Sequence, residues 1–201
     1  MNFFTHIAIS KILYNQIKSK INLNKSAFIY GNIKPDLSSK LMKKPHTMDN
    51  YFNFVCSRAD NLIRGEETLK DFSLELGEIC HYVCDFFCLY HTEIELFNNL
   101  NDHFLYELKL HFILKKFTQK EKSEIVTCNK EASRDFASII SSRISEYSAD
   151  TSLLKKDISY AISTSAWICE SVACFVNAAA ETVSDNEMDS CPAVYLSGGH
   201  G

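Results

Sequence analysis

Two histidine–carboxylate pairs at helical spacing constrain the fold of this chain more than any other feature of its sequence. His81 stands four positions before Asp85, and His103 stands four positions before Glu107. Residues four apart lie on one face of an α-helix, so each pair can direct an imidazole and a carboxylate toward the same point. Imidazole and carboxylate groups are ligands of zinc and related divalent metals. The pairs therefore predict helices that face one another across a metal site.

The surroundings of the pairs distinguish a metal site from an ordinary polar contact. A single pair of this kind on a helix is most often a surface pair or a satisfied polar pair. Here apolar residues flank both pairs, and burying an unpaired polar group costs about 1–3 kcal/mol. A metal ion would supply the missing partner. Cys80, Cys84 and Cys88 form a stripe on the first of these helices, which we interpret as small core residues rather than as ligands.

Few residues in this chain break helices. Its 201 residues include only 6 glycines and 3 prolines, which favours one domain of long helices with short connections. We predict an all-α, single-domain, multi-helix bundle over residues 1–181, with the metal site between helices. Residues 182–201 lose helical periodicity and are predicted to form a flexible tail. The expected helices span residues 3–20, 48–64, 68–90, 99–118, 121–148 and 151–181.

Three segments carry more detailed expectations. The polar sequence of residues 121–148 indicates one largely solvent-facing helix. The glycine and proline between Gly31 and Asp36 predict a loop that presents the Asp36 carboxylate at a defined place. The last helix is apolar on most faces, which raises the alternative of a membrane span. Because Glu170 near its middle would make insertion unfavourable, a buried central helix is the preferred interpretation.

Net charge and the first residues narrow the functional class. The formal net charge of -4 argues against a nucleic-acid partner held by a basic surface. The first residues lack the basic start, apolar core and cleavage site of a secretory signal. We therefore expect a cytoplasmic protein without a transmembrane segment. Neither observation argues against an enzyme that acts on a phosphate ester through metal ions.

The histidines and carboxylates of the first half of the chain follow a specific order. They are His6, Asp36, His46, His81, Asp85, His91, His103 and Glu107. This order resembles that of the bacterial zinc-dependent phospholipase C family, which is related to the single-strand-specific zinc nucleases. The resemblance covers roughly residues 3–110 and is most specific in the Gly-x-x-x-Pro-Asp sequence and in the step from His81 to His91. It implies the all-helical fold of that family and a site for three zinc ions.

The resemblance also implies three groups of ligands, with Asp85 shared between two of them. The first zinc would be held by Asp36, His46, His81 and Asp85. The second would be held by His91, His103 and Glu107. The third would be held by His6 and Asp85.

Met1 is the remaining ligand that we expect. Family members complete the third site with the amino nitrogen and carbonyl oxygen of an N-terminal tryptophan exposed by cleavage, and this sequence has no tryptophan before His6. In the related nucleases the N-terminal residue stands five positions before the first histidine, as Met1 stands before His6. The amine and carbonyl of Met1 are therefore expected to bind the third metal.

The resemblance implies a metal-dependent phosphoester hydrolase. Two to three zinc ions per chain would activate a water for attack on phosphorus, and the resemblance makes Asp36 the candidate catalytic base. The expected substrate is a phosphate ester, with phospholipid as one candidate. Two alternatives stay open: a protein on the same scaffold that binds metal without hydrolysis, and one in which residues 191–201 serve as a docking peptide or are modified by the helical domain.

Overall fold

Helices make up the regular structure of this protein. The computed structural model describes residues 1–37, 44–65, 67–92, 99–126, 131–152 and 154–189. Within these ranges the chain forms ten helices and no strand, which confirms the predicted all-α fold. The helices are α1 (Phe3–Ile17), α2 (Lys25–Gly31), α3 (Lys34–Leu37), α4 (Met48–Arg64), α5 (Leu69–Phe86), α6 (Leu89–Thr92), α8 (Leu100–Lys116), α9 (Gln119–Val126), α10 (Phe136–Ala149) and α11 (Lys155–Asp189).

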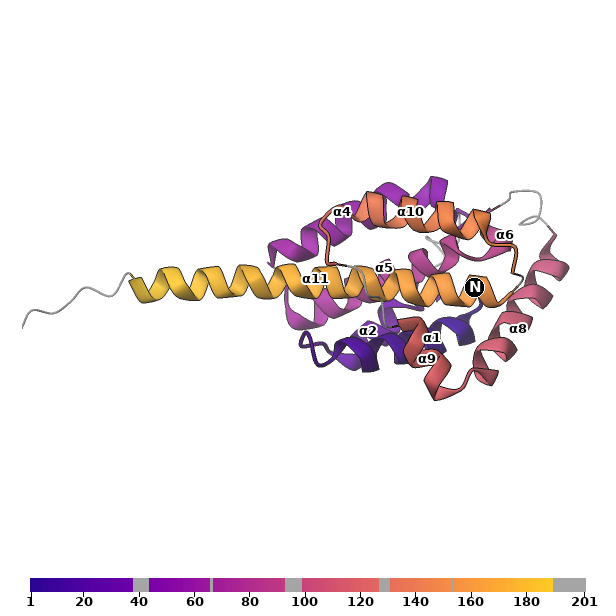
Figure 1. Cartoon of the computed structure of the whole chain (residues 1–201), viewed down its shortest axis with the longest axis horizontal. Coiled ribbons are helices and arrows are strands. Elements are labelled where there is room, and N and C mark those ends of the chain that lie inside the picture. Colours follow the sequence, from indigo (N-terminus) through magenta and orange to yellow (C-terminus); the bar gives the residue numbers. More distant parts are fainter. Residues whose placement is uncertain (38–43, 66, 93–98, 127–130, 153, 190–201) are drawn as a thin grey trace, which may run out of the picture.

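Helix α5 forms the centre of the bundle and packs against α1, α2, α4 and α11 (Figure 1). It begins after Thr68, whose hydroxyl accepts a hydrogen bond from the backbone N–H of Asp71. Every residue of α5 from Leu76 to its end is buried. A helix buried on all faces requires apolar side chains on all faces, and any polar group among them requires a partner. His81 and Asp85 both lie in this buried part.

Two glycines allow α2 and α5 to cross at close range. A Cβ atom on Gly31 would overlap the backbone carbonyl of Leu74, and a Cβ atom on Gly77 would overlap that of Phe28. No larger residue fits at either position unless one helix moves. This close crossing brings the end of α2 to the middle of α5, where the carbonyl oxygen of Asn32 lies 2.9 Å from Nδ1 of His81.

The predicted loop between Gly31 and Asp36 is wrong, because most of it is helical. Gly31 ends α2, and Asp36 lies in the single-turn helix α3. The buried Pro35 lies in the first turn of α3, where a missing backbone N–H leaves no helical hydrogen bond unmade. Asp36 is still held at a defined place, by a helical turn rather than by a loop.

The single solvent-facing helix predicted over residues 121–148 is also wrong. The structure places two helices here, α9 and α10, and residues 131–135 before α10 are not helical. Asp135 caps α10, because its carboxylate accepts a hydrogen bond of 2.8 Å from the backbone N–H of Ser138. One face of α10 is buried through Phe136, Ile139 and Ile140 against α4 and α11. The 3.6-residue spacing of these apolar residues decides the packing despite the polar composition of the segment.

The last helix, α11, lies along α1, α4, α5 and α10, and its far end extends beyond the other helices (Figure 1). Between Ile158 and Ala173 most of its apolar side chains are buried, which agrees with a buried central helix. Glu170 forms an ion pair of 2.6 Å with Lys20 of the segment after α1. Among the described residues, no helix is both long and apolar enough to cross a membrane.

The end of α11 differs from the expected end of the last helix. The helix continues past residue 181 to Asp189, so the first part of the expected tail is helical. Residues 190–201, which make up the rest of that tail, lie outside the described residues.

Candidate metal centre

The first group of predicted ligands surrounds one carboxylate oxygen of Asp85. Oδ2 of Asp85 lies 3.0 Å from Nδ1 of His46 and 3.3 Å from Nε2 of His81. The two imidazole nitrogens lie 3.0 Å from each other. Oδ1 of Asp36 completes the group at 3.9 Å from His46 and 3.7 Å from His81. Helix α5, helix α3 and the residues before α4 therefore supply four side chains that converge on one point.

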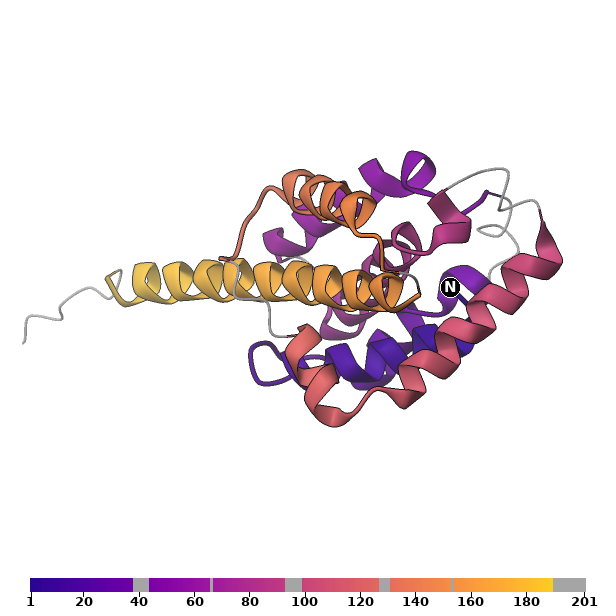
Figure 2. The same ribbon diagram turned by 45° about the vertical axis from the view of Figure 1, so that its right-hand side comes forward.

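A second group lies between α6 and α8. Nε2 of His91 lies 3.1 Å from Nε2 of His103 and 3.1 Å from Oε1 of Glu107. His103 and Glu107 are one helical turn apart, and their ligand atoms are separated by 2.9 Å. Helix α8 packs against α1 and passes close to the amino terminus (Figure 2). This packing brings the second group close to the first.

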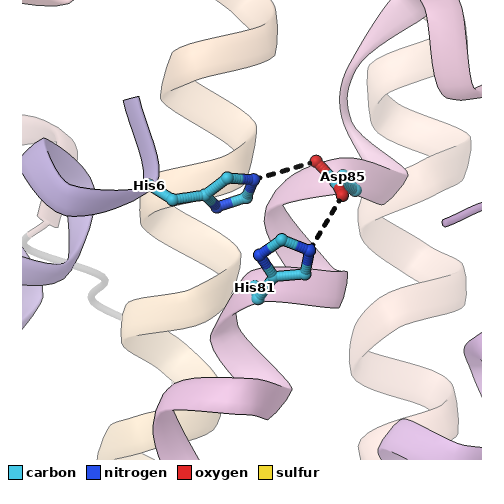
Figure 3. Close-up of side chains that lie close together, drawn as sticks. All are labelled: His6, His81 and Asp85. Carbon is cyan, nitrogen blue, oxygen red and sulfur yellow. Dashed lines mark hydrogen bonds and ion pairs between the residues drawn. The ribbon is translucent and has the colours of Figure 1, made fainter. Parts of the chain in front are cut away.

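The third group forms on the other oxygen of Asp85. Nε2 of His6, on α1, lies 3.2 Å from Oδ1 of Asp85. Figure 3 shows His6 and His81 directed at the Asp85 carboxylate from two sides. The α-amino group of Met1 forms an ion pair with the same oxygen. It also lies 3.2 Å from Oε1 of Glu107 and 3.4 Å from Nε2 of His91, so Met1 links the second and third groups.

A backbone contact orients the imidazole of His81. Nδ1 of His81 donates a hydrogen bond to the carbonyl oxygen of Asn32, which directs Nε2 at the first group. Both residues are buried, so this contact is shielded from water. A histidine ligand whose second nitrogen is held in this way binds metal in a fixed orientation. The crossing of α2 over α5 is therefore part of the site.

Electrostatics in the centre follow from burial and from the Met1 ammonium. Burial alone would raise the pKa of Asp85, but the ammonium and the neighbouring histidines hold that pKa well below its ordinary value. The same competition holds the pKa of Glu107 below its ordinary range. Burial lowers the pKa of His6, and also that of His91, which favours their neutral, ligand-competent form. These directions favour anionic Asp85 and Glu107, whereas Asp85 outweighs burial at His81 and raises the pKa of that imidazole.

The donor set fits zinc. Tetrahedral zinc with bonds of about 2.0–2.1 Å to nitrogen or oxygen separates its ligand atoms by roughly 3.3 Å. The distances between ligand atoms within the first two groups range from 2.9 to 3.9 Å and include that value. In both groups two imidazole nitrogens also face each other, at 3.0 and 3.1 Å. A cation between such nitrogens would bind both lone pairs.

The centre borders an open cavity of about 360 Å³. Asp36, His46, His103 and Glu107 line it, and the side chain of Asp36 is 25% exposed. Asp85 is completely buried behind them. A ligand in the cavity would therefore meet Asp36 directly, whereas Asp85 can only act through the groups that it holds.

The structure brings together all nine residues predicted for the site, from Met1 to Glu107. It also adds one that we had assigned to the core. Cys88 lies close to His91 and Glu107, and the three could each give one ligand atom to a shared metal, with these atoms all within 4.8 Å of one another. The signal was available in the sequence, because Cys88 stands three positions before His91. The regular cysteine stripe concealed it.

The helical fold and the three converging groups define a class: an all-α protein with a candidate multinuclear histidine–carboxylate metal centre. The sequence model of the zinc-dependent phospholipase C family matches residues 5–154, three quarters of the chain, and the protein belongs to that family. The match extends beyond the roughly 3–110 that we expected and includes every predicted ligand except Met1. Neither a curated protein nor a solved structure was found to match the chain.

Proposed function

We propose that this protein is a zinc-dependent phosphoric ester hydrolase of the phospholipase C type, with a phosphate ester, and phospholipid as one candidate, as its substrate. One observation carries the proposal: nine potential ligands converge in three groups at and beside Asp85. Six of them border an open cavity: Met1, Asp36, His46, His91, His103 and Glu107. Family membership supports the choice of zinc and of phosphoester chemistry. The proposed ligands are Met1, His6, Asp36, His46, His81, Asp85, His91, His103 and Glu107.

Each part of the site has a separate role in the proposed reaction. Bound zinc would polarise the phosphoryl oxygens and acidify a water. Asp36 borders the cavity and accepts the proton of the attacking water as general base. Asp85 holds His6 on one oxygen and His46 and His81 on the other, so it fixes the spacing of the groups. Apolar residues around α5 exclude water from behind the centre.

The proposal is tested by metal content and hydrolysis together. The chain is purified without chelators or a histidine tag, and elemental analysis is expected to find two to three zinc ions per chain. Bis(p-nitrophenyl) phosphate and phospholipid in mixed micelles serve as substrates. Asp36→Asn is expected to lower kcat for the hydrolysed substrate by about 100-fold or more, because a general base contributes roughly that much.

Three outcomes separate the readings of this test. If the folded protein, prepared with zinc in excess, bound no metal, both the metal site and the hydrolase would be overturned. Bound zinc without hydrolysis of any diester, monoester or phospholipid would favour a protein that binds metal without catalysis. Full activity in Asp36→Asn would remove Asp36 as the base while leaving the hydrolase in place.

Adding residues before Met1 is expected to remove one metal ion from each chain. The α-amino group of Met1 lies against Asp85 and Glu107, and its pKa is raised well above the ordinary value because the pull of these carboxylates outweighs burial. In the zinc-free chain an ammonium fills this place, and in the loaded chain a neutral amine would bind metal. An extension of three residues, such as Gly-Ser-Ala, converts the amine into an amide, which is a poor ligand.

Zinc content by elemental analysis and the rate of phosphodiester hydrolysis are the measurements, and both are expected to fall. The matched control carries the same three residues after Gly201 and should retain both. An extended chain with a full zinc complement and unchanged rate would show that Met1 is not a ligand.

A further inference from the structure

The cysteine between the first and second ligand groups is held in place by the backbone of both. Cys88 lies in the turn between α5 and α6. Its N–H donates to the carbonyl of Asp85 at 3.0 Å, and its carbonyl accepts from the N–H of His91 at 2.7 Å. The position of Cys88 is thus fixed relative to two predicted ligands. Its side chain is completely buried.

The neighbouring cysteines of the same stripe have other partners. Sγ of Cys80 lies 3.4 Å from Sγ of Cys169, and Sγ of Cys84 lies 3.5 Å from Oγ of Ser165. Both partners belong to α11, so Cys80 and Cys84 contribute to the packing of α5 against that helix. Cys88 instead has Sγ grouped with the ligand atoms of His91 and Glu107, all within 4.8 Å of one another. The stripe therefore divides into two packing residues and one at the metal centre.

We propose that Cys88 is a thiolate ligand of the metal held by His91, His103 and Glu107. On binding, a sulfur–metal bond forms, the thiol proton leaves to the buffer, and one water leaves the metal. Sulfur and imidazole ligands suit zinc and other soft or borderline metals. The second group would then offer four protein ligands, which is the number that closes a tetrahedral zinc site. The water that attacks the substrate would then be activated at the groups around Asp85 and not at the second group.

This inference rests on the metal centre of the proposed function but not on hydrolysis. The full chain is freed of zinc and loaded with Co²⁺, and its absorption spectrum is recorded. A thiolate ligand produces a charge-transfer band in the near ultraviolet, and the visible bands of Co²⁺ report binding by any ligand. The parent chain is expected to show both, and Cys88→Ser to keep the visible bands and lose the charge-transfer band.

Cys84→Ser is the matched control, because Cys84 lies one helical turn earlier on α5 and faces Ser165. It is expected to keep the charge-transfer band. In a zinc competition titration, Cys88→Ser should bind one zinc at least about tenfold more weakly. Losing a residue that only orients a ligand already weakens metal binding by about that factor, so losing a ligand should cost at least as much. Circular dichroism checks that each variant is folded.

A parent chain without the charge-transfer band would overturn the proposal, and so would a Cys88→Ser chain that keeps it. If Cys88→Ser does not fold, cadmium NMR of the loaded parent chain decides, since a sulfur ligand moves the resonance strongly downfield. Absence of a downfield resonance would overturn the proposal. Cobalt binding with both bands but no phosphoester hydrolysis would instead contradict the hydrolase alone.

Discussion

Asp85→Asn is expected to have the largest effect of any single substitution on metal binding and catalysis. Asp85 contacts His46 and His81 through Oδ2, and His6 and the Met1 amine through Oδ1. Asparagine replaces one of these oxygens with an NH₂ group, which cannot bind metal. The chain should lose at least one zinc and should hydrolyse phosphodiester at least about 100-fold more slowly, beyond the range known for groups that only orient ligands.

The zinc-free chain adds a second readout for this variant. Here Asp85 pairs with the completely buried ammonium of Met1. Removing one partner of a buried ion pair costs about 3–5 kcal/mol, so the free energy of unfolding in urea should fall by that amount after chelator treatment. Because Glu107 still lies 3.2 Å from the ammonium and partly compensates its charge, we expect a loss near the lower end of this range.

Glu75→Gln is the matched control for Asp85→Asn. It makes the same chemical change on the same helix, at a residue that pairs with Arg58 at 3.1 Å near the surface. Such pairs contribute about 0–1 kcal/mol, so stability should change little and zinc content should not change. Full zinc content in Asp85→Asn would contradict the shared role assigned to this carboxylate.

Gly77→Ala is expected to damage both the fold and the metal centre. Alanine inside a helix normally gains about 0.5–1 kcal/mol over glycine. Here the added methyl group would overlap the backbone carbonyl of Phe28 and come 3.0 Å from the backbone nitrogen of Asn32. Because backbone atoms of α2 cannot rotate away as side chains do, we expect a net loss of about 1–3 kcal/mol, typical of overpacked cores.

The effect on zinc distinguishes this prediction from ordinary overpacking. Moving α2 away from α5 would lengthen the contact between the Asn32 carbonyl and Nδ1 of His81, now 2.9 Å. Loss of such an orienting contact lowers metal affinity by about 10–100-fold. Urea unfolding of the chelator-treated chain measures the first effect, and a zinc competition titration measures the second.

Gly65→Ala is the control for Gly77→Ala, because it introduces backbone strain without a steric overlap. Gly65 ends α4 with a φ of 76°, and a Cβ there would meet nothing within 4 Å. Its substitution should cost about 1–2 kcal/mol through backbone strain alone, with zinc affinity unchanged. If Gly77→Ala were as stable as the parent and bound zinc normally, the close crossing of α2 and α5 would not support the site.

Local signals explain why much of the helical structure could be predicted. Helix α4 has the predicted bounds, since Gly65 adopts the left-handed conformation that ends a helix and Met48 begins the apolar spacing. The same applies to His103 and Glu107, whose four-residue spacing on α8 brings their ligand atoms to 2.9 Å. These features depend on residues within one or two helical turns, which a sequence displays directly.

Features that depend on distant residues could not be predicted in this way. The sequence pattern predicts one helix over residues 121–148 and not the break before α10. The start of α10 depends on burial of its apolar face against α4 and α11, which are distant in the sequence. Helix α3 is a single turn, too short for any periodicity. Cys88 shares its spacing with Cys80 and Cys84, and only the turn after α5 directs it to His91 rather than to α11.

The sequence by itself determined the helical class, the His–carboxylate pairs and, through their order, the family. These properties follow from residue spacing along a single helix and from the types of ligand present. Only the tertiary structure decided which of these side chains lie together, because His6, His46 and His81 come from separate segments that meet at Asp85. The physical reason is close packing: two glycines let α2 approach α5, and this crossing places the carbonyl oxygen of Asn32 against His81 and the buried His81 against Asp85.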